Sequence, residues 1–141
     1  MQMDFEKNTH YINTDLLLSA PIELTSLARI MAPEHVQDAP ISCLSVGRSE
    51  TLEHYANFEA FGPVGHYETP EESINALLDA IEKLPESLRA VWQACSRRTV
   101  DIGYRSGSAP AHVVSAISVC TLARMQALGI DMAITVYSMA D

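Results

Sequence analysis

The chain has 141 residues, of which 48% are hydrophobic and 19% are charged, a balance typical of a globular domain and not of a disordered chain. Eighteen acidic residues against nine Lys and Arg give a net charge of −9. This charge argues against nucleic acid and anionic membranes as partners, because both are bound through Lys and Arg.

The first thirteen residues, "MQMDFEKNTHYIN", lack the basic start and apolar run of a signal peptide. We therefore expect a polar N-terminal segment over 1–13, a single domain over 14–141 and a cytoplasmic location. The longest apolar runs, such as "DLLLSAPI", are too short to cross a bilayer. The three cysteines, Cys43, Cys95 and Cys120, include no CxxC pair and have apolar neighbours, which predicts buried free thiols and no zinc site.

In the first half of the chain, "DLLLSA" predicts a strand and "IELTSLARIM" a helix with one apolar face. "ISCLSVG" and the aromatic-rich "HYANFEAFG" predict two further strands. "TPEESINALLDAIEKLP" predicts a helix with Thr69 as N-cap and Pro70 in the first turn. Pro85 separates this helix from a second segment, "ESLRAVWQAC", so the middle helix is expected in two pieces.

In the second half, "TVDIGYRSG" alternates and predicts a strand with one buried face. We expect the second Ser-Ala-Pro, at residues 108–110, to start a helix with six residues inside or at its edge: Val114, Ile117, Thr121, Leu122, Met125 and Leu128. "IDMAITVY" predicts a final strand with Ile130, Met132, Ile134 and Val136 directed inward. The order β-α-β-β-α-β-α-β indicates an α+β two-layer sandwich of the ferredoxin-like kind, with its helices on one face of the sheet.

Two segments of the chain resemble each other, "SAPIELTSLARIMAP" and "SAPAHVVSAISVCTLARMQ". Each begins where a predicted strand gives way to a helix, and another strand follows each helix. We expect the two helices to occupy similar places on the sheet, because similar burial selects similar residues. One sequence leaves open whether this reflects duplication or shared constraint.

No catalytic or metal-binding constellation is evident. The five histidines show neither HxH nor HxxxH spacing, and no Gly-x-Ser-x-Gly elbow is present. We therefore expect no catalytic residues, no metal site and no cofactor. The turn "GYRSGSAP" precedes a predicted helix start and offers a weaker alternative, a small-ligand site near Tyr104 and Arg105.

The acidic charge is concentrated between residues 50 and 86, where nine acids face a single basic residue, Lys83. Aromatic residues are interleaved with these acids. Acids favour fast capture of a basic protein and aromatic rings supply buried anchors, although a solvated helix face would show a similar charge run. The residues predicted to bind a partner are Glu50, Glu53, Tyr55, Phe58, Glu59, Phe61, Glu68, Glu71 and Glu72.

Trp92 followed by "VDIGYRSG", then "LGIDMAITVY", together with "DLLLSAPIELTSLARIM", resembles a family of small bacterial domains of unknown function. The resemblance implies an α+β fold and carries over no functional residue. Some small acidic proteins of this general type are immunity proteins of bacterial toxin systems, an analogy at the level of the fold.

Two functions follow as hypotheses. The first is an immunity or inhibitor protein that binds and occludes a basic partner, a cognate bacterial toxin domain. The second is a small-ligand-binding or regulatory domain with a pocket near Tyr104 and Arg105. An enzyme is not expected, for want of a paired acid and base, and the sequence leaves the oligomeric state open.

Overall fold

The computed structural model describes residues 8–34, 36, 38–62 and 65–138. Within these residues the chain is an α+β protein with four helices and a mixed, open six-stranded sheet, which confirms the predicted class. The elements in chain order are β1 (His10–Ala20), α1 (Thr25–Met31), β2 (Ile41–Arg48), β3 (His54–Gly62), β4 (Gly65–His66), α2 (Pro70–Glu82), α3 (Glu86–Ala94), β5 (Arg97–Arg105), α4 (Val119–Ala127) and β6 (Asp131–Tyr137).

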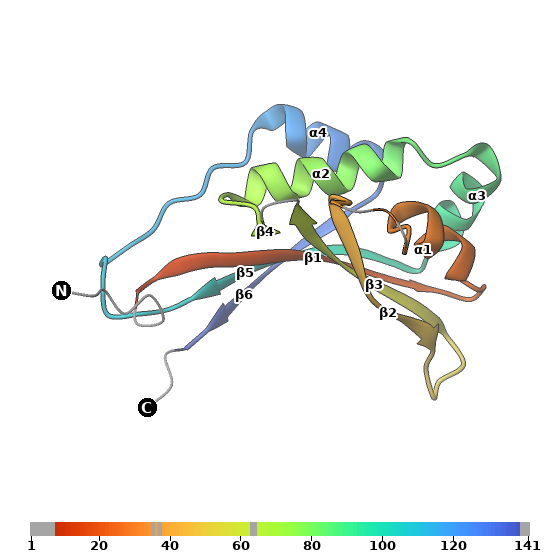
Figure 1. Cartoon of the computed structure of the whole chain (residues 1–141), viewed down its shortest axis with the longest axis horizontal. Helices are drawn as coiled ribbons and strands as arrows, with labels where there is room; N and C mark the ends of the chain where they lie inside the picture. Colours follow the sequence, from red (N-terminus) through yellow and green to blue (C-terminus); the bar gives the residue numbers. More distant parts are fainter. Residues whose placement is uncertain (1–7, 35, 37, 63–64, 139–141) are drawn as a thin grey trace.

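The strand order of the sheet is β2-β3-β1-β5-β6, and the two-residue strand β4 pairs with β3. The central strand β1 is antiparallel to both of its neighbours, and β6 is parallel to β5 at one edge. All four helices lie on one face of the sheet (Figure 1). The other face carries no helix in the described part of the chain, and we call it the open face.

Strand alternation and helix periodicity place the core between these two layers. Leu16, Leu18 and Ala20 of β1 are at most 1% exposed, because alternate side chains of a strand point to the same face. The predicted stripe of α2 is buried against them, as expected, from Ile74 to Ile81. Thr69 caps this helix as predicted, since its hydroxyl oxygen accepts a hydrogen bond of 3.2 Å from the backbone N–H of Glu72.

Strand β1 begins at His10, inside the segment 1–13 that we expected to precede the domain. His10 and Tyr11 pair with the end of β5. The Tyr11 hydroxyl lies 2.7 Å from the hydroxyl oxygens of both Thr14 and Ser73, and the latter two residues are fully buried. Residues 10–13 therefore belong to the folded domain, and residues 1–7 lie outside the described part.

The C-terminal third differs from the prediction in where its helix starts. Helix α4 begins at Val119, with the Ser118 side chain as its cap. The second Ser-Ala-Pro therefore lies in a long connection, where Val114 is 82% exposed. Leu122 is 41% exposed, whereas its counterpart Leu27 in α1 is fully buried. The two similar segments thus have different surroundings, and similar burial does not explain their likeness.

The final strand differs in the environment of its apolar residues. Met132, Ile134 and Val136 were expected to face inward, but they are 45%, 62% and 61% exposed. They lie on the helix-bearing face of an edge strand, and α4 packs against α2 without covering them. Cys120 is also exposed, contrary to expectation, since it lies on the outer side of α4. Within the described residues, no helix combines the length and hydropathy needed to cross a membrane.

Candidate functional site

The nine residues predicted to bind a partner do not form one surface. They are distributed over the β2–β3 turn, the open face of β3, the start of α2 and the core. The turn carries Glu50 and Glu53; the open face carries Tyr55, Glu59 and Phe61; Glu68, Glu71 and Glu72 lie at the start of α2; Phe58 lies in the core.

Phe58 was expected to anchor a partner, but its side chain is fully buried. It lies on the same face of β3 as Ala56 and Ala60, two residues away on either side, which are also buried beneath the helices. Aromatic content alone does not tell which face of a strand a ring occupies, because alternate positions point to opposite faces. Phe58 is a core residue, and we exclude it from any binding surface.

Two of the predicted acids outside β3 already have partners within the chain. The Glu71 Oε1 atom accepts hydrogen bonds from the Ser118 backbone N–H at 2.6 Å and the Thr121 hydroxyl at 3.0 Å. The backbone hydrogen bond from Ser118, followed by those from the side chains, lowers the pKa of Glu71. Glu53 accepts a hydrogen bond of 3.1 Å from Ser96. Glu71 therefore connects the start of α2 to the start of α4.

A different group of acids lies across the centre of the open face. Asp15 of β1 is directly opposite Glu59 of β3 on one side and Asp101 of β5 on the other. Residues opposite each other on neighbouring strands have Cβ atoms about 5 Å apart, and like charges at such positions repel. We call Asp15, Glu59 and Asp101 the carboxylate row.

The two outer members of the carboxylate row, Glu59 and Asp101, have hydrogen-bond partners. The central member, Asp15, has one oxygen without such a partner among the described residues. The Asn13 amide donates to the Glu59 Oε2 atom at 2.7 Å, and His66 Nε2 lies 3.2 Å from the same oxygen. The Thr135 hydroxyl lies 2.8 and 3.0 Å from the two oxygens of Asp101. The Oδ1 atom of Asp15 is buried and has no hydrogen-bond partner among the described residues.

Burial, and then the negative charges of Glu59 and Asp101, raise the pKa of Asp15 to about 6. His66 has a smaller effect in the opposite direction. At neutral pH Asp15 is therefore mostly ionised, and the carboxylate row concentrates negative charge at the middle of the sheet. Holding three carboxylates together in this way is unfavourable for the free protein.

The nearby arginines do not neutralise the carboxylate row. Arg97 and Arg105 lie on the open face of β5, each four residues from Asp101. The Arg97 Nε atom donates to the Thr99 hydroxyl at 3.4 Å, and the charges that shift the pKa of Asp15 are those of Glu59, Asp101 and His66, not of an arginine. Arg98 lies on the opposite face and donates to the backbone carbonyls of Trp92, Cys95 and Gly129. It closes the end of α3, a structural role.

Sequence reasoning found only Glu59 of this row. Asp15 and Asp101 each stand alone in an apolar or alternating strand, and nothing in the sequence gives the strand order or register that brings them together. The one signal in the sequence was that each aspartate occupies a polar position beside an apolar residue of a strand, which places it on the face opposite the core. Within the described residues, no group of three or more Asp, Glu, His or Cys side chains is arranged to hold a metal ion.

Tyr104 and Arg105, the alternative ligand-binding pair, do not face one site. Adjacent residues of a strand point to opposite faces, so Tyr104 lies with Ile102 on the helix side and Arg105 lies on the open face. The Tyr104 ring packs edge-on against Tyr11, with the ring centres 5.9 Å apart. These two side chains therefore cannot line a common pocket in this conformation.

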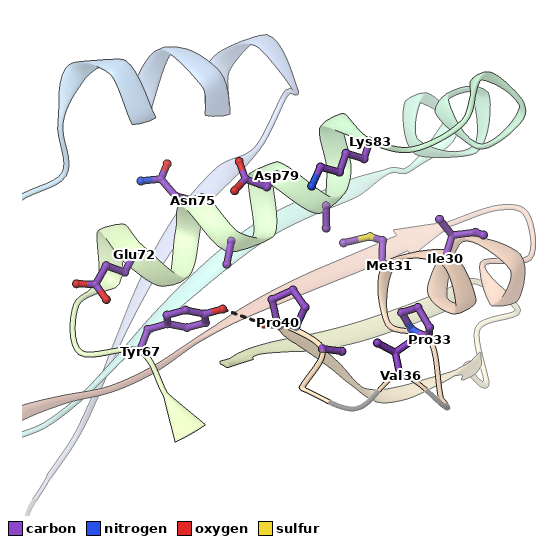
Figure 2. A pocket seen from close by; sticks show the side chains of 13 residues that line it. Ile30, Met31, Pro33, Val36, Pro40, Tyr67, Glu72, Asn75, Asp79 and Lys83 are labelled. Atoms are coloured by element: carbon purple, nitrogen blue, oxygen red, sulfur yellow. Dashed lines mark hydrogen bonds between the residues drawn. The ribbon is translucent and has the colours of Figure 1, made fainter. Parts of the chain in front are cut away.

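A groove on the helical side is a further candidate site. It lies between α2 and the segment from α1 to β2 and has a volume of about 680 Å³ (Figure 2). Ile30, Pro33 and Val36 form its apolar side, and Glu72 and Asp79 of α2 contribute carboxylates on the other. At one end the Tyr67 hydroxyl donates to the Pro40 carbonyl at 3.4 Å.

The charge in this groove is largely compensated. Asp79 forms an ion pair of 2.7 Å with Arg124, which also binds Glu82 at 2.7 Å, and Lys83 lines the groove itself. The groove is therefore mainly an apolar site with a few polar groups, in contrast to the carboxylate row.

Comparison of the chain with protein-family models, curated proteins and solved structures found no match.

Proposed function

We propose that this chain is an inhibitor of the immunity-protein type, which binds a basic partner protein, a bacterial toxin domain, in the cytoplasm. The carboxylate row is placed at the centre of the contact. The observation that carries this proposal is the buried Oδ1 atom of Asp15, which has no hydrogen-bond partner in the described part of the chain. It lies between two further carboxylates, on a face that no described helix covers. A Lys or Arg side chain of the partner would supply the opposite charge beside the partly exposed Asp15 side chain.

A polar group that is buried without a hydrogen-bond partner is unfavourable. Buried acceptors in folded proteins nearly always have a hydrogen-bond partner, and charge-assisted bonds from Arg or Lys to a carboxylate are the strongest kind. A basic side chain over Asp15 would also reduce its repulsion with Glu59 and Asp101. Binding would therefore relieve an unfavourable interaction that the free protein carries.

Aromatic residues flank the carboxylate row on the same face. Tyr55 and Phe61 are an even number of residues from Glu59 along β3, so they lie on the same face of the strand, the open face. Phe61 is 38% exposed and packs edge-on against His66, with ring centres 4.9 Å apart. Aromatic side chains, Tyr in particular, are common among the residues that contribute most of the binding energy at protein interfaces.

We also interpret the core of the fold as ferredoxin-like. The antiparallel order of β2, β3, β1 and β5 and the helices on a single face support this interpretation, with α4 and β6 as an addition at one edge. In such a two-layer arrangement the uncovered sheet face is available to a partner.

The experiment compares two charge-matched variants. The chain is coexpressed with the protein encoded by the adjacent gene, and the dissociation constant of the complex is measured at low and high salt. Asp15→Asn with Asp101→Asn removes two charges from the row, and Glu50→Gln with Glu68→Gln removes two from exposed positions elsewhere. We expect the first variant to bind at least about tenfold more weakly, because each lost charge pair costs several kcal/mol. We expect the second to bind nearly as the wild type does. Equal losses, or none, would contradict the proposal.

The groove supports a second candidate function, the binding of a small ligand. Its volume of about 680 Å³ lies within the range of about 300–1,000 Å³ for ligand sites. In this case the ligand site is the groove and not the vicinity of Tyr104 and Arg105. Thermal-shift screening of a metabolite panel tests this, with Ile30→Lys as the blocked control, since Ile30 lines the groove and is 53% exposed. A ligand of the groove should stabilise the wild type and not the variant.

A further inference from the structure

The edge strand β6 presents an apolar surface that nothing in the described chain covers. Met132, Ile134 and Val136 stand beside Val100, Ile102 and Tyr104 of β5 in the parallel register. They therefore continue the face on which the core is built, yet each is 45% exposed or more. One side of β6 pairs with β5, and its other side pairs with no described strand.

The two edges of the sheet differ in how they are protected against pairing. At the opposite edge, β2 has an irregularity between Cys43 and Ser45, and Gly47 and Arg48 end the strand. Bulges, glycines and charges of this kind disfavour pairing with another strand. Strand β6, "DMAITVY", has regular register and contains no Lys, Arg, Pro or Gly. It has the features of a strand that pairs with a partner.

The distribution of charge indicates which partner this edge can accept. Residues 1–90 contain fifteen acids and five bases, whereas residues 91–141 contain three acids and four bases. Residues 119–137, which include α4 and β6, contain only two charged residues, Arg124 and Asp131. Two copies of a chain with net charge −9 repel each other at most surfaces. At the surface formed by α4 and β6 they can approach without this electrostatic repulsion.

The sequence of β6 is also complementary to itself. If two β6 strands pair antiparallel about a two-fold axis at Ile134, each Ile134 meets its counterpart. Met132 then faces Val136 of the other copy, and on the reverse face Ala133 faces Thr135. Every pair on the helix-bearing face is apolar, as strand pairing favours, and no like charges are opposed.

We propose that two copies of this chain form a symmetric dimer through β6, which makes one sheet continuous across the two-fold axis. A contact in which the same surface serves both copies is the common form of homodimer, and addition of a strand to an open edge is an established mode of recognition. The contact pairs the free backbone edge of β6, sets Met132, Ile134 and Val136 beside apolar side chains of the other copy, and leaves the open face accessible.

The first test measures mass in solution by light scattering and sedimentation over a range of concentrations. The wild type should have twice the 15.5 kDa of the chain. Ile134→Lys should return to the monomer mass, because two lysines would meet at the axis. Ile30→Lys, a substitution at an exposed isoleucine of α1, should remain dimeric. Circular dichroism checks that both variants fold.

The second test fixes the register. Ile134→Cys is made with Cys120→Ser, which removes the exposed native thiol. Opposed residues of an antiparallel pair have Cα atoms about 4.5–5.5 Å apart, within the range of a disulfide. Mild oxidation should therefore give a covalent dimer, whereas Ile30→Cys in the same background should stay uncrosslinked.

Three results would overturn the proposal: a wild-type monomer at all concentrations, a dimer that persists in Ile134→Lys, or absence of the crosslink at residue 134. A monomer whose β6 becomes protected from hydrogen exchange only in the complex with another protein would assign this edge to that protein. None of these results bears on the carboxylate row, which lies on the other face of the sheet.

Discussion

Replacing Asp15 by Asn should make the free protein more stable at neutral pH, although it removes a charge from the proposed binding surface. Asn has nearly the same shape, so the strand pairing of β1 is retained. Its amide can donate to the neighbouring carboxylates Glu59 and Asp101, where Asp15 repels them. A residue selected for folding alone would not behave in this way.

The magnitude follows from the pKa of Asp15, which is about 6 in the folded protein against an ordinary value of 3.8. The folded state holds this proton more tightly than the unfolded state. The contribution of Asp15 to the free energy of unfolding of the wild type is therefore fully present below about pH 4 and is lost as the pH rises through 6. The difference in pKa corresponds to ~3 kcal/mol for a fully buried group. Because the Asp15 side chain is only half-buried, solvent screening reduces this to about 1–2 kcal/mol.

Urea unfolding between pH 4 and pH 8 measures this effect. The gain in stability of Asp15→Asn over the wild type should grow by about 1–2 kcal/mol between pH 4 and pH 7.5. Glu50→Gln, which removes one charge from the exposed β2–β3 turn, serves as the control and should differ from the wild type by a small, pH-independent amount. A variant that is less stable than the wild type at pH 7.5, or a gain that does not change with pH, would refute the electrostatic reasoning.

Three further substitutions test the core and the surroundings of the carboxylate row. Phe58→Ala should lower the free energy of unfolding by about 3–5 kcal/mol, as loss of a fully buried ring does; calorimetry or urea unfolding would show this, and a change below about 1 kcal/mol would be inconsistent with a core position. Trp92→Phe loses the indole N–H that donates to the Leu128 carbonyl at 3.0 Å and should cost about 1 kcal/mol, measured in the same way. Gly103→Ala should displace the Asn13 side-chain amide, because a Cβ atom at residue 103 would lie 2.8 Å from Asn13 Oδ1. NMR of this amide should show a changed hydrogen bond to Glu59. An unchanged amide signal would contradict the close approach of the two residues.

Local signals in the sequence predict much of the fold. The N-cap Thr69, the first-turn proline Pro70 and the apolar stripe of α2 act within one helix, so a single sequence contains the information that determines them. The break at Pro85 is equally local. These features, and the α+β class that follows from the alternation of elements, agree with the structure.

The features that the sequence did not reveal depend on contacts between distant segments. Met132, Ile134 and Val136 alternate like the inner face of a covered strand, but burial depends on whether a helix lies over that edge. Asp15 and Asp101 meet only because β5 pairs with β1 in one register. A shift of that register by one residue would move Asp101 to the other face of the sheet.

The most direct test of the proposed function is the pH titration of the Asp15 carboxyl carbon by NMR, in the free protein and in the complex with the protein from the adjacent gene. We predict a midpoint near 6 in the free protein and a midpoint below 3.8, the ordinary value, in the complex, because a basic side chain of the partner would stabilise the ionised carboxylate. A midpoint that stays near 6 in the complex would show that no cation meets the carboxylate row, and would contradict the proposed mode of binding.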